Sequence, residues 1–318
     1  MKKMTTTRRS WLARLAYAAI CIIWGTTYYA IFAALQGGLP PFVLGAMRYA
    51  LAGLLILIIS MVRKEAQFNR GFICSHLLIG IVMMGGGQAI IFWAQQYIAS
   101  GYAAILEASL PLWFVVLDGR IRATLFRNKM IVAGLILGFL GILLLFFNHL
   151  GAGARGIGTM AIIGALVVIA SCIFWALASL YTVKKFHDTP LLAGLVWQIF
   201  GGLIFCLIMS GILSEWKQFE PVRVTTRAWL GAGYLAIAGS VIALMAYHWL
   251  LKQWPSAVVG TYAYINPVVA VVIGYFAANE ELGVFEFSGM IAILFAAWMV
   301  NKGREQLAAN EASFKKVM

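Results

Sequence analysis

Charged side chains are scarce in this sequence of 318 residues. Asp, Glu, Lys and Arg make up 11% of the chain and hydrophobic residues 63%, whereas about a quarter of an average soluble domain is charged. The mean hydropathy is +0.90. This composition excludes an ordinary water-soluble domain and indicates a protein that folds in a lipid bilayer.

Cysteine is also sparse, and the motifs of metal and nucleotide chemistry are missing. The four cysteines, Cys21, Cys74, Cys172 and Cys206, lie in apolar stretches without a CxxC spacing, so neither a disulfide framework nor a zinc site is predicted. The four histidines show no HxxxH or HExxH spacing, and no glycine-rich segment matches a Walker motif. We therefore expect no metal, no cofactor and no ATP site.

Long apolar stretches are abundant instead. A helix needs about 17–25 residues to cross a bilayer. A lipid-facing open sheet would leave backbone groups unpaired in hydrocarbon. The sequence thus predicts an all-α, polytopic membrane protein with ten transmembrane helices, at residues 15–35, 42–62, 73–97, 102–119, 130–148, 157–182, 191–213, 228–250, 257–277 and 285–301.

The net charge of +13 is distributed unevenly between the connecting segments. If the N-terminus is cytoplasmic, about nineteen Lys and Arg residues lie inside and four lie outside, at Arg155, Lys217, Arg223 and Arg227. This bias is the positive-inside pattern of membrane proteins. We expect both termini in the cytoplasm, and we interpret the basicity as a topology signal rather than as a sign of nucleic-acid binding.

Short motifs recur in the same order in two halves of the chain. The recurring pairs are Ile22–Tyr28 with Cys172–Ala178, Pro41–Gly45 with Pro190–Gly194, and Ser109-Leu110-Pro111 with Ile265-Asn266-Pro267. Because each half has five spans, an odd number, the copies insert in opposite directions, as in many secondary transporters. We therefore divide the chain into a cytoplasmic segment 1–14, five-helix repeats 15–149 and 150–301, and a cytoplasmic tail 302–318.

Several of these motifs resemble the EamA family of the drug/metabolite transporter superfamily. The resemblance rests on Ile22–Tyr28, on Pro40-Pro41 with the following Arg48-Tyr49, and on Tyr262–Ala270 ahead of Glu280-Glu281-Leu282. It covers roughly residues 15–301. It implies a ten-helix carrier of the bacterial inner membrane, commonly an exporter of amino acids, related metabolites or toxic compounds, and often proton-coupled.

Arg48 and Glu107 are two of the ionisable residues within the predicted spans. Such residues cost about 2.5–3.5 kcal/mol each on insertion scales and are candidates for function. Arg48 and Glu107 lie near the outer ends of the second and fourth spans, at similar depth, and we expect them to pair. The pair either clamps two helices or binds substrate, with Glu107 taking a cationic group or a proton and Arg48 taking a carboxylate.

Uncharged residues extend this predicted site. Gln88 follows three glycines, and Asn266 precedes Pro267, which removes a helix hydrogen bond; both can serve a ligand or a neighbouring helix. His248 joins Glu107 as a coupling candidate, the alternative being a solvated helix end. Weaker candidates are Gln95, Gln198 and Ser240. The predicted substrate-binding set is Trp24, Tyr28, Arg48, Gln88, Trp93, Glu107, Trp175, Tyr262, Tyr264 and Asn266.

These features favour a secondary carrier over two other classes. A channel should show a polar stripe repeated along a span, and an intramembrane enzyme a nucleophile with its base; neither is evident. We expect a proton-coupled exporter of small metabolites that works by alternating access, with a cavity between spans one to four and six to nine. Small residues in spans five and ten, such as Gly134, Gly138 and Gly141, predict close packing within the fold or in a homodimer.

Overall fold

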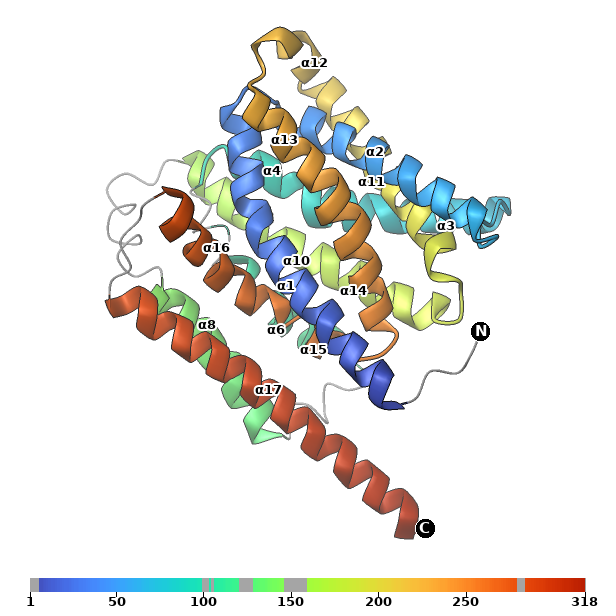
Figure 1. Cartoon of the computed structure of the whole chain (residues 1–318), viewed down its shortest axis with the longest axis vertical. Helices are drawn as coiled ribbons and strands as arrows, with labels where there is room; N and C mark the ends of the chain where they lie inside the picture. Colours follow the sequence, from blue (N-terminus) through green and yellow to red (C-terminus); the bar gives the residue numbers. More distant parts are fainter. Residues whose placement is uncertain are drawn as a thin grey trace.

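Helices form wherever the sequence is apolar without interruption. The computed structural model describes residues 6–98, 103, 106–119, 128–145, 159–278 and 284–317, and within these ranges no strand occurs. The helices of the first half are α1 (Thr6–Gln36), α2 (Pro41–Val62), α3 (Arg70–Gly80), η1 (Ile81–Ala89), α4 (Ile90–Ala94), α6 (Leu110–Leu117) and α8 (Lys129–Leu145) (Figure 1).

The second half repeats this order. Its helices are α10 (Thr159–Phe186), α11 (Leu191–Ile212), α12 (Glu215–Gln218), η2 (Pro221–Arg223), α13 (Thr226–Tyr234), η3 (Leu235–Ile242), α14 (Ala243–Leu251), α15 (Ser256–Val259), α16 (Tyr262–Ala278) and α17 (Val284–Val317). The all-α prediction is confirmed.

Each of the ten predicted stretches contains a helix, and six continuous helices in the described ranges are long and apolar enough to cross a membrane. They are Ser10–Gln36, Pro41–Val62, Arg70–Ala94, Thr159–Phe186, Leu191–Ile212 and Thr226–Leu251. Shorter apolar helices follow at Lys129–Gly141 and Phe287–Val300.

Two helices extend beyond the segment boundaries that the sequence predicts. Helix α1 begins at Thr6, inside the predicted segment 1–14, and α17 continues through the predicted tail to Val317. The boundary near residue 149 and the motif at residues 280–282 lie outside the described residues.

The local sequence explains where several helices begin. Pro41 is the first residue of α2, where its missing N–H costs nothing. The Asn69 side chain accepts hydrogen bonds from the first backbone N–H groups of α3, and the Thr225 side chain does so for α13.

The two halves are related by inversion. The corresponding helices α2 and α11 pack along each other in opposite directions, because Gly45 lies against Cys206 and Gly53 against Phe200. The corresponding helices α8 and α17 do the same, with Gly134 against Val300. Antiparallel packing of equivalent helices is what a pseudo-twofold axis in the membrane plane requires.

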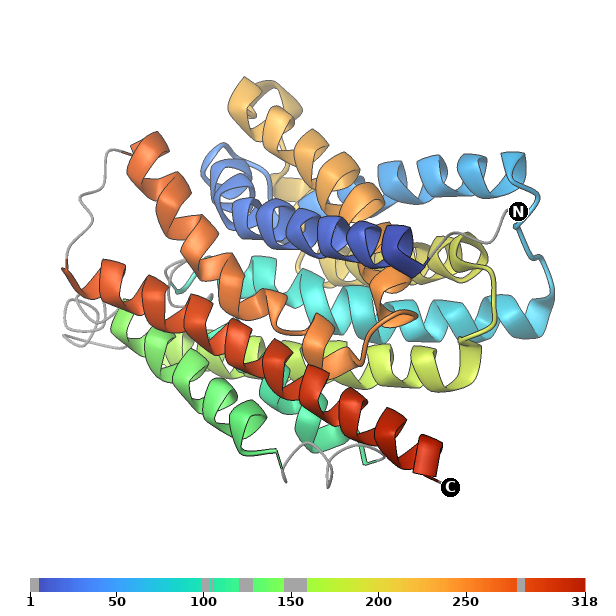
Figure 2. The ribbon, with the colours of Figure 1, turned by 60° about the horizontal axis from the view of Figure 1, so that its bottom comes forward.

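Other features follow this symmetry. The third span of each half carries a π-helical segment at its centre, η1 and η3. Figure 2 shows α8 and α17 side by side along one flank of the bundle, as predicted for spans five and ten. The remaining helices surround the middle of the protein.

The two ends of the bundle differ in charge. One end carries the short helix α12 and is called here the α12 end. The opposite end, called here the basic end, carries the loops between α2 and α3, α10 and α11, and α14 and α15. Its basic residues include Arg63, Lys64, Arg70, Lys184, Lys185 and Lys252.

Candidate functional site

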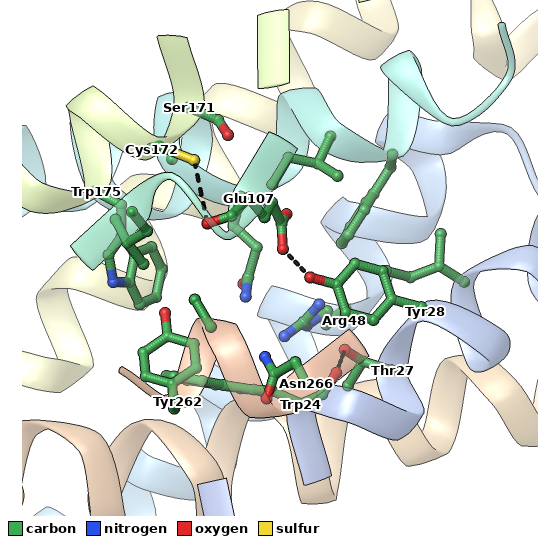
Figure 3. Close-up of a pocket in the computed structure, with 17 residues that line it drawn as sticks. Trp24, Thr27, Tyr28, Arg48, Glu107, Ser171, Cys172, Trp175, Tyr262 and Asn266 are labelled. Atoms are coloured by element: carbon green, nitrogen blue, oxygen red, sulfur yellow. Dashed lines mark hydrogen bonds between the residues drawn. The ribbon is translucent and has the colours of Figure 1, made fainter. Parts of the chain in front are cut away.

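A central cavity lies between the two halves. Its empty volume, which includes space open to solvent, is about 590 Å³. Residues of α1, α2, η1, α4, α6, α10 and α16 line it, together with Glu107 from the turn before α6. Figure 3 shows the labelled side chains pointing into this space from both halves.

The glycines of η1 allow α10 to approach the cavity closely. A Cβ atom on Gly87 would lie 3.1 Å from the backbone nitrogen of Trp175, so a larger residue would push the two helices apart. The close approach brings Trp175 and Cys172 of α10 to the cavity wall. Gly86 and Gly87 therefore position the side of the site that α10 forms.

Glu107 is held by a tyrosine from the first span. The Tyr28 hydroxyl donates a hydrogen bond to Glu107 Oε2 (Figure 3). Glu107 keeps partial exposure, whereas Tyr28 is buried. This arrangement leaves the carboxylate with free acceptor capacity toward the cavity, since a carboxylate offers about four lone-pair sites.

Arg48 is fully buried and forms no salt bridge with a carboxylate of the described residues. Its Nε donates to Ser240 Oγ at 2.6 Å, and its guanidinium lies 5.6 Å from the centre of the Phe92 ring. Its Nη2 has no hydrogen-bond partner among the described residues. A buried guanidinium with an open donor is unusual, because buried polar groups are normally satisfied.

The predicted direct pair between Arg48 and Glu107 is wrong. Both residues line the cavity, but the salt bridges within 4 Å in the described part of the chain are His187–Asp188 and Arg223–Glu220. Arg48 reaches toward η3 and Glu107 toward α1, so different helices hold each charge. The cavity thus presents a cationic and an anionic point that do not neutralise each other by contact.

Two amides complete the polar lining. Gln88 Oε1 accepts from the Tyr49 hydroxyl at 2.8 Å. The Asn266 amide, oriented so that both of its atoms are satisfied, donates to the carbonyls of Cys21 at 3.1 Å and Tyr262 at 3.0 Å. Asn266 therefore ties α16 to α1 beside Pro267, where the helix lacks one backbone donor.

Four aromatic rings close the cavity toward the basic end. This aromatic cluster consists of Trp24, Trp175, Tyr247 and Tyr262, with ring centres 4.6–5.9 Å apart. The Tyr247 hydroxyl accepts from Trp175 Nε1 at 2.9 Å and bonds to Ser179. Trp24 Nε1 donates to the Gly239 carbonyl in η3. Helices from both halves therefore meet in this cluster.

Comparisons with known proteins show to which family this chain belongs. The profile of the EamA-like transporter family matches residues 11–147 and, a second time, residues 162–302. This chain belongs to that family. The two matches also agree with the internal repeat. As an EamA-family protein it is a membrane transporter, and the family is one of transporters rather than enzymes.

Relatives of this EamA-family chain carry names of the same kind. It is 30% identical over 290 residues to an uncharacterized inner membrane transporter, YedA, of Escherichia coli K12, covering 91% of this chain and 90% of the relative. It is 26% identical over 299 residues to Protein PecM of Dickeya dadantii, with 91% and 92% covered. These likenesses support a multi-pass protein of the inner membrane.

A more distant bacterial relative and a solved structure extend the comparison. The uncharacterized transporter YoaV of Bacillus subtilis is 21% identical over 286 residues, covering 90% of this chain and 95% of the relative. One solved crystal structure superposes with a TM-score of 0.73 and 19% sequence identity, covering 93% of this chain and 98% of the other. At that identity the likeness concerns the fold alone.

Most predicted site residues of this EamA-family transporter meet in one place. Eight of them line the central cavity: Trp24, Tyr28, Arg48, Gln88, Glu107, Trp175, Tyr262 and Asn266. The cavity draws on spans one to four, six and nine; α11 and the α13–α14 span, which were also expected to line it, contribute no lining residue. The role of these residues in binding stays a prediction.

Three predicted residues lie elsewhere. The Tyr264 hydroxyl donates to the Leu135 carbonyl in α8, and the Trp93 ring packs on Tyr97, so neither lines the central cavity. His248 is buried, not solvated, and bonds to Gln198 in a second cavity. Tyr247 was missed, because one aromatic residue in an apolar helix has no distinguishing sequence signal.

Proposed function

We propose that this protein is a secondary carrier that exports amino acids or related small zwitterionic metabolites by alternating access, driven by protons. The observation that carries this proposal is the separation of Arg48 and Glu107 in one cavity. A buried charge without a contacting partner is costly, and it is typically retained where a ligand supplies the counter-charge.

The two charges match the two ends of an amino acid. The guanidinium of Arg48, which lines the cavity without a salt bridge among the described residues, suits a carboxylate, which a guanidinium can bind through two parallel hydrogen bonds. Glu107, steadied by Tyr28, suits an ammonium group. The aromatic cluster offers apolar surface to a side chain between them. Because direct neutralisation is avoided, both points stay available to substrate.

The charge of the bundle ends supports an orientation of the protein in the membrane. In inner-membrane proteins the end rich in Lys and Arg faces the cytoplasm, so we place the basic end inside and the α12 end outside. Both termini then lie in the cytoplasm. The aromatic cluster separates the central cavity from the cytoplasmic side, as expected of one state of an alternating-access cycle.

Counterflow in proteoliposomes tests this proposal. Vesicles loaded with a panel of unlabelled amino acids are diluted into each labelled counterpart, and a carrier shows saturable, trans-stimulated uptake. We expect Arg48→Met and Glu107→Gln to abolish counterflow. Arg223→Gln is the matched control, because Arg223 is exposed and bridges only Glu220.

Two outcomes would contradict the proposal. Uptake that rises linearly with concentration and lacks trans-stimulation indicates a channel or facilitator. Counterflow that survives in either single variant would show that the substrate site is wrong.

A further inference from the structure

A second cavity lies at the basic end, on the other side of the aromatic cluster. It is formed by α3, the end of α10, the start of α11 and the end of α14, and its polar lining includes His76, Gln198, His248 and Lys252. His248 follows Tyr247 in the chain, and the centres of their rings lie 5.6 Å apart. Tyr247 of the aromatic cluster thus lies next to a residue that lines the second cavity.

A hydrogen-bonded chain of three side chains crosses this cavity. His248 Nε2 bonds to Gln198 Oε1 at 2.8 Å, and Gln198 Nε2 bonds to His76 Nδ1 at 3.1 Å. An amide oxygen only accepts and an amide nitrogen only donates. His248 therefore carries its proton on Nε2, and His76 accepts at Nδ1 and carries its proton on Nε2.

Each histidine keeps one buried nitrogen without a partner. His76 Nε2 and His248 Nδ1 make no hydrogen bond with any described residue, although their residues are only 1% and 7% exposed. The His76 ring is also held on both faces, because the rings of Phe72 and Phe186 lie 4.3 Å from it, centre to centre. Apolar packing would not need two linked histidines with open nitrogens.

The surroundings of this chain contain few charges. Lys252, at the end of α14, donates to the Thr189 carbonyl, and burial lowers its pKa. The charges of Asp188 and Glu65, from the loops after α10 and α2, oppose this shift by raising the pKa of Lys252. The exposed His187 bonds to Asp188. No carboxylate lies within 4 Å of either ring of the chain among the described residues.

We propose that His76, Gln198 and His248 form the proton-binding site of this carrier, which exchanges its proton with the cytoplasm when the basic end is open. The proposal rests on the proposed carrier function and deepens it. A proton from water adds to the lone pair of His248 Nδ1, forms an N–H bond and leaves a cationic ring. No redox partner or leaving group is needed.

The geometry makes this step depend on conformation. In the present state the Gln198 amide fixes the tautomer of both rings, and a cationic ring would be stranded away from water. Opening the basic end hydrates His248 and permits proton exchange with the cytoplasm. Because His248 adjoins Tyr247 of the aromatic cluster, opening that end and exchanging the proton are linked events. The substrate charges in the central cavity are not required to titrate.

Imidazole nitrogen NMR tests the site without any substrate. The chain has four histidines, so ¹⁵N-histidine labelling in nanodiscs gives few signals, which His76→Gln and His248→Gln assign. At alkaline pH we expect both residues as the Nε2–H form. On acidification they should titrate as a coupled pair, so that Gln198→Leu shifts both midpoints. Independent titration, or no protonation down to about pH 5, would overturn the proposal.

Transport separates this proposal from the carrier function itself. Counterflow of an amino acid that the wild type carries needs no driving ion, whereas uphill accumulation under a pH gradient does. We expect His248→Gln and His76→Gln to keep counterflow and lose gradient-driven accumulation. His187→Gln, at a histidine that lines the same cavity but is 55% exposed and lies outside the hydrogen-bonded chain, should keep both. Loss of counterflow in the two cavity variants, or retained accumulation, would contradict a coupling role.

The two proposals fail in different ways. If Glu107→Gln keeps counterflow, the substrate site is wrong while the proton site stands. If His248→Gln keeps gradient-driven accumulation, the proton site is wrong while the carrier function stands. If no compound of the panel is carried, the NMR titration alone decides the proton site.

Discussion

A double-mutant cycle on Arg48 and Glu107 tests how the central cavity holds its two charges. Arg48→Met removes a charge-assisted hydrogen bond to Ser240, worth about 1.5–3 kcal/mol. It also removes a buried ion whose desolvation costs several kcal/mol. These terms oppose each other, so we expect the free energy of unfolding to stay level or rise.

Glu107→Gln should change stability little. The glutamine oxygen still accepts from Tyr28, so we expect a change of less than about 1 kcal/mol. Because the two side chains form no salt bridge and share no hydrogen-bond partner, the two effects should add within about 0.5 kcal/mol in the double variant. Transport should be lost in all three variants.

Denaturant unfolding in mixed micelles measures the stabilities, and counterflow measures transport on the same preparations. A directly contacting pair would behave differently, with each single variant losing about 3–5 kcal/mol and the double variant recovering it. A coupling energy above about 1 kcal/mol, or transport regained in the double variant, would refute the separated arrangement.

Three further changes test other parts of the structure. Gly87→Val should separate η1 from Trp175 and lower the unfolding free energy by about 1–3 kcal/mol, seen as a lower Tm. Tyr247→Phe removes the hydroxyl that Trp175 and Ser179 share; leaving buried groups unpaired should cost about 1–3 kcal/mol, and an unchanged Tm would contradict this. Glu215 accepts from two backbone N–H groups at the start of α2, and burial raises its pKa. The folded state therefore binds the proton more tightly, stability falls as the pH rises through the interval between the unfolded and folded pKa values, and Glu215→Gln should remove that pH dependence of Tm.

The fold was predictable because membrane insertion depends on the length and hydropathy of each continuous stretch of the sequence. The length of an apolar stretch predicts a span, and the motif order with an odd span count predicts the inversion. The π-helical segments η1 and η3 were not predictable, since they depend on how the third span of each half packs against its neighbours. Gln88 lies within η1 and Ser240 within η3.

The sequence predicted most of the residues that meet at the site, but it did not predict which of them contact each other. Polar residues such as Gln88 and Asn266 are conspicuous within apolar spans, and both line the cavity. The partner of Arg48 is Ser240 rather than Glu107. Two residues at similar depth in the membrane meet only if the rotation of their helices turns them toward each other. The role of Gln198 as the link between His76 and His248 depends on three helices that converge only in the fold.

The central claim is that one cavity recognises a carboxylate and an ammonium group at separate points. The most direct measurement compares inhibition of counterflow by a transported amino acid, by its methyl ester and by its deaminated acid. We predict that the wild type discriminates against both analogues, each of which lacks one charged contact. Equal inhibition by all three compounds would contradict the account.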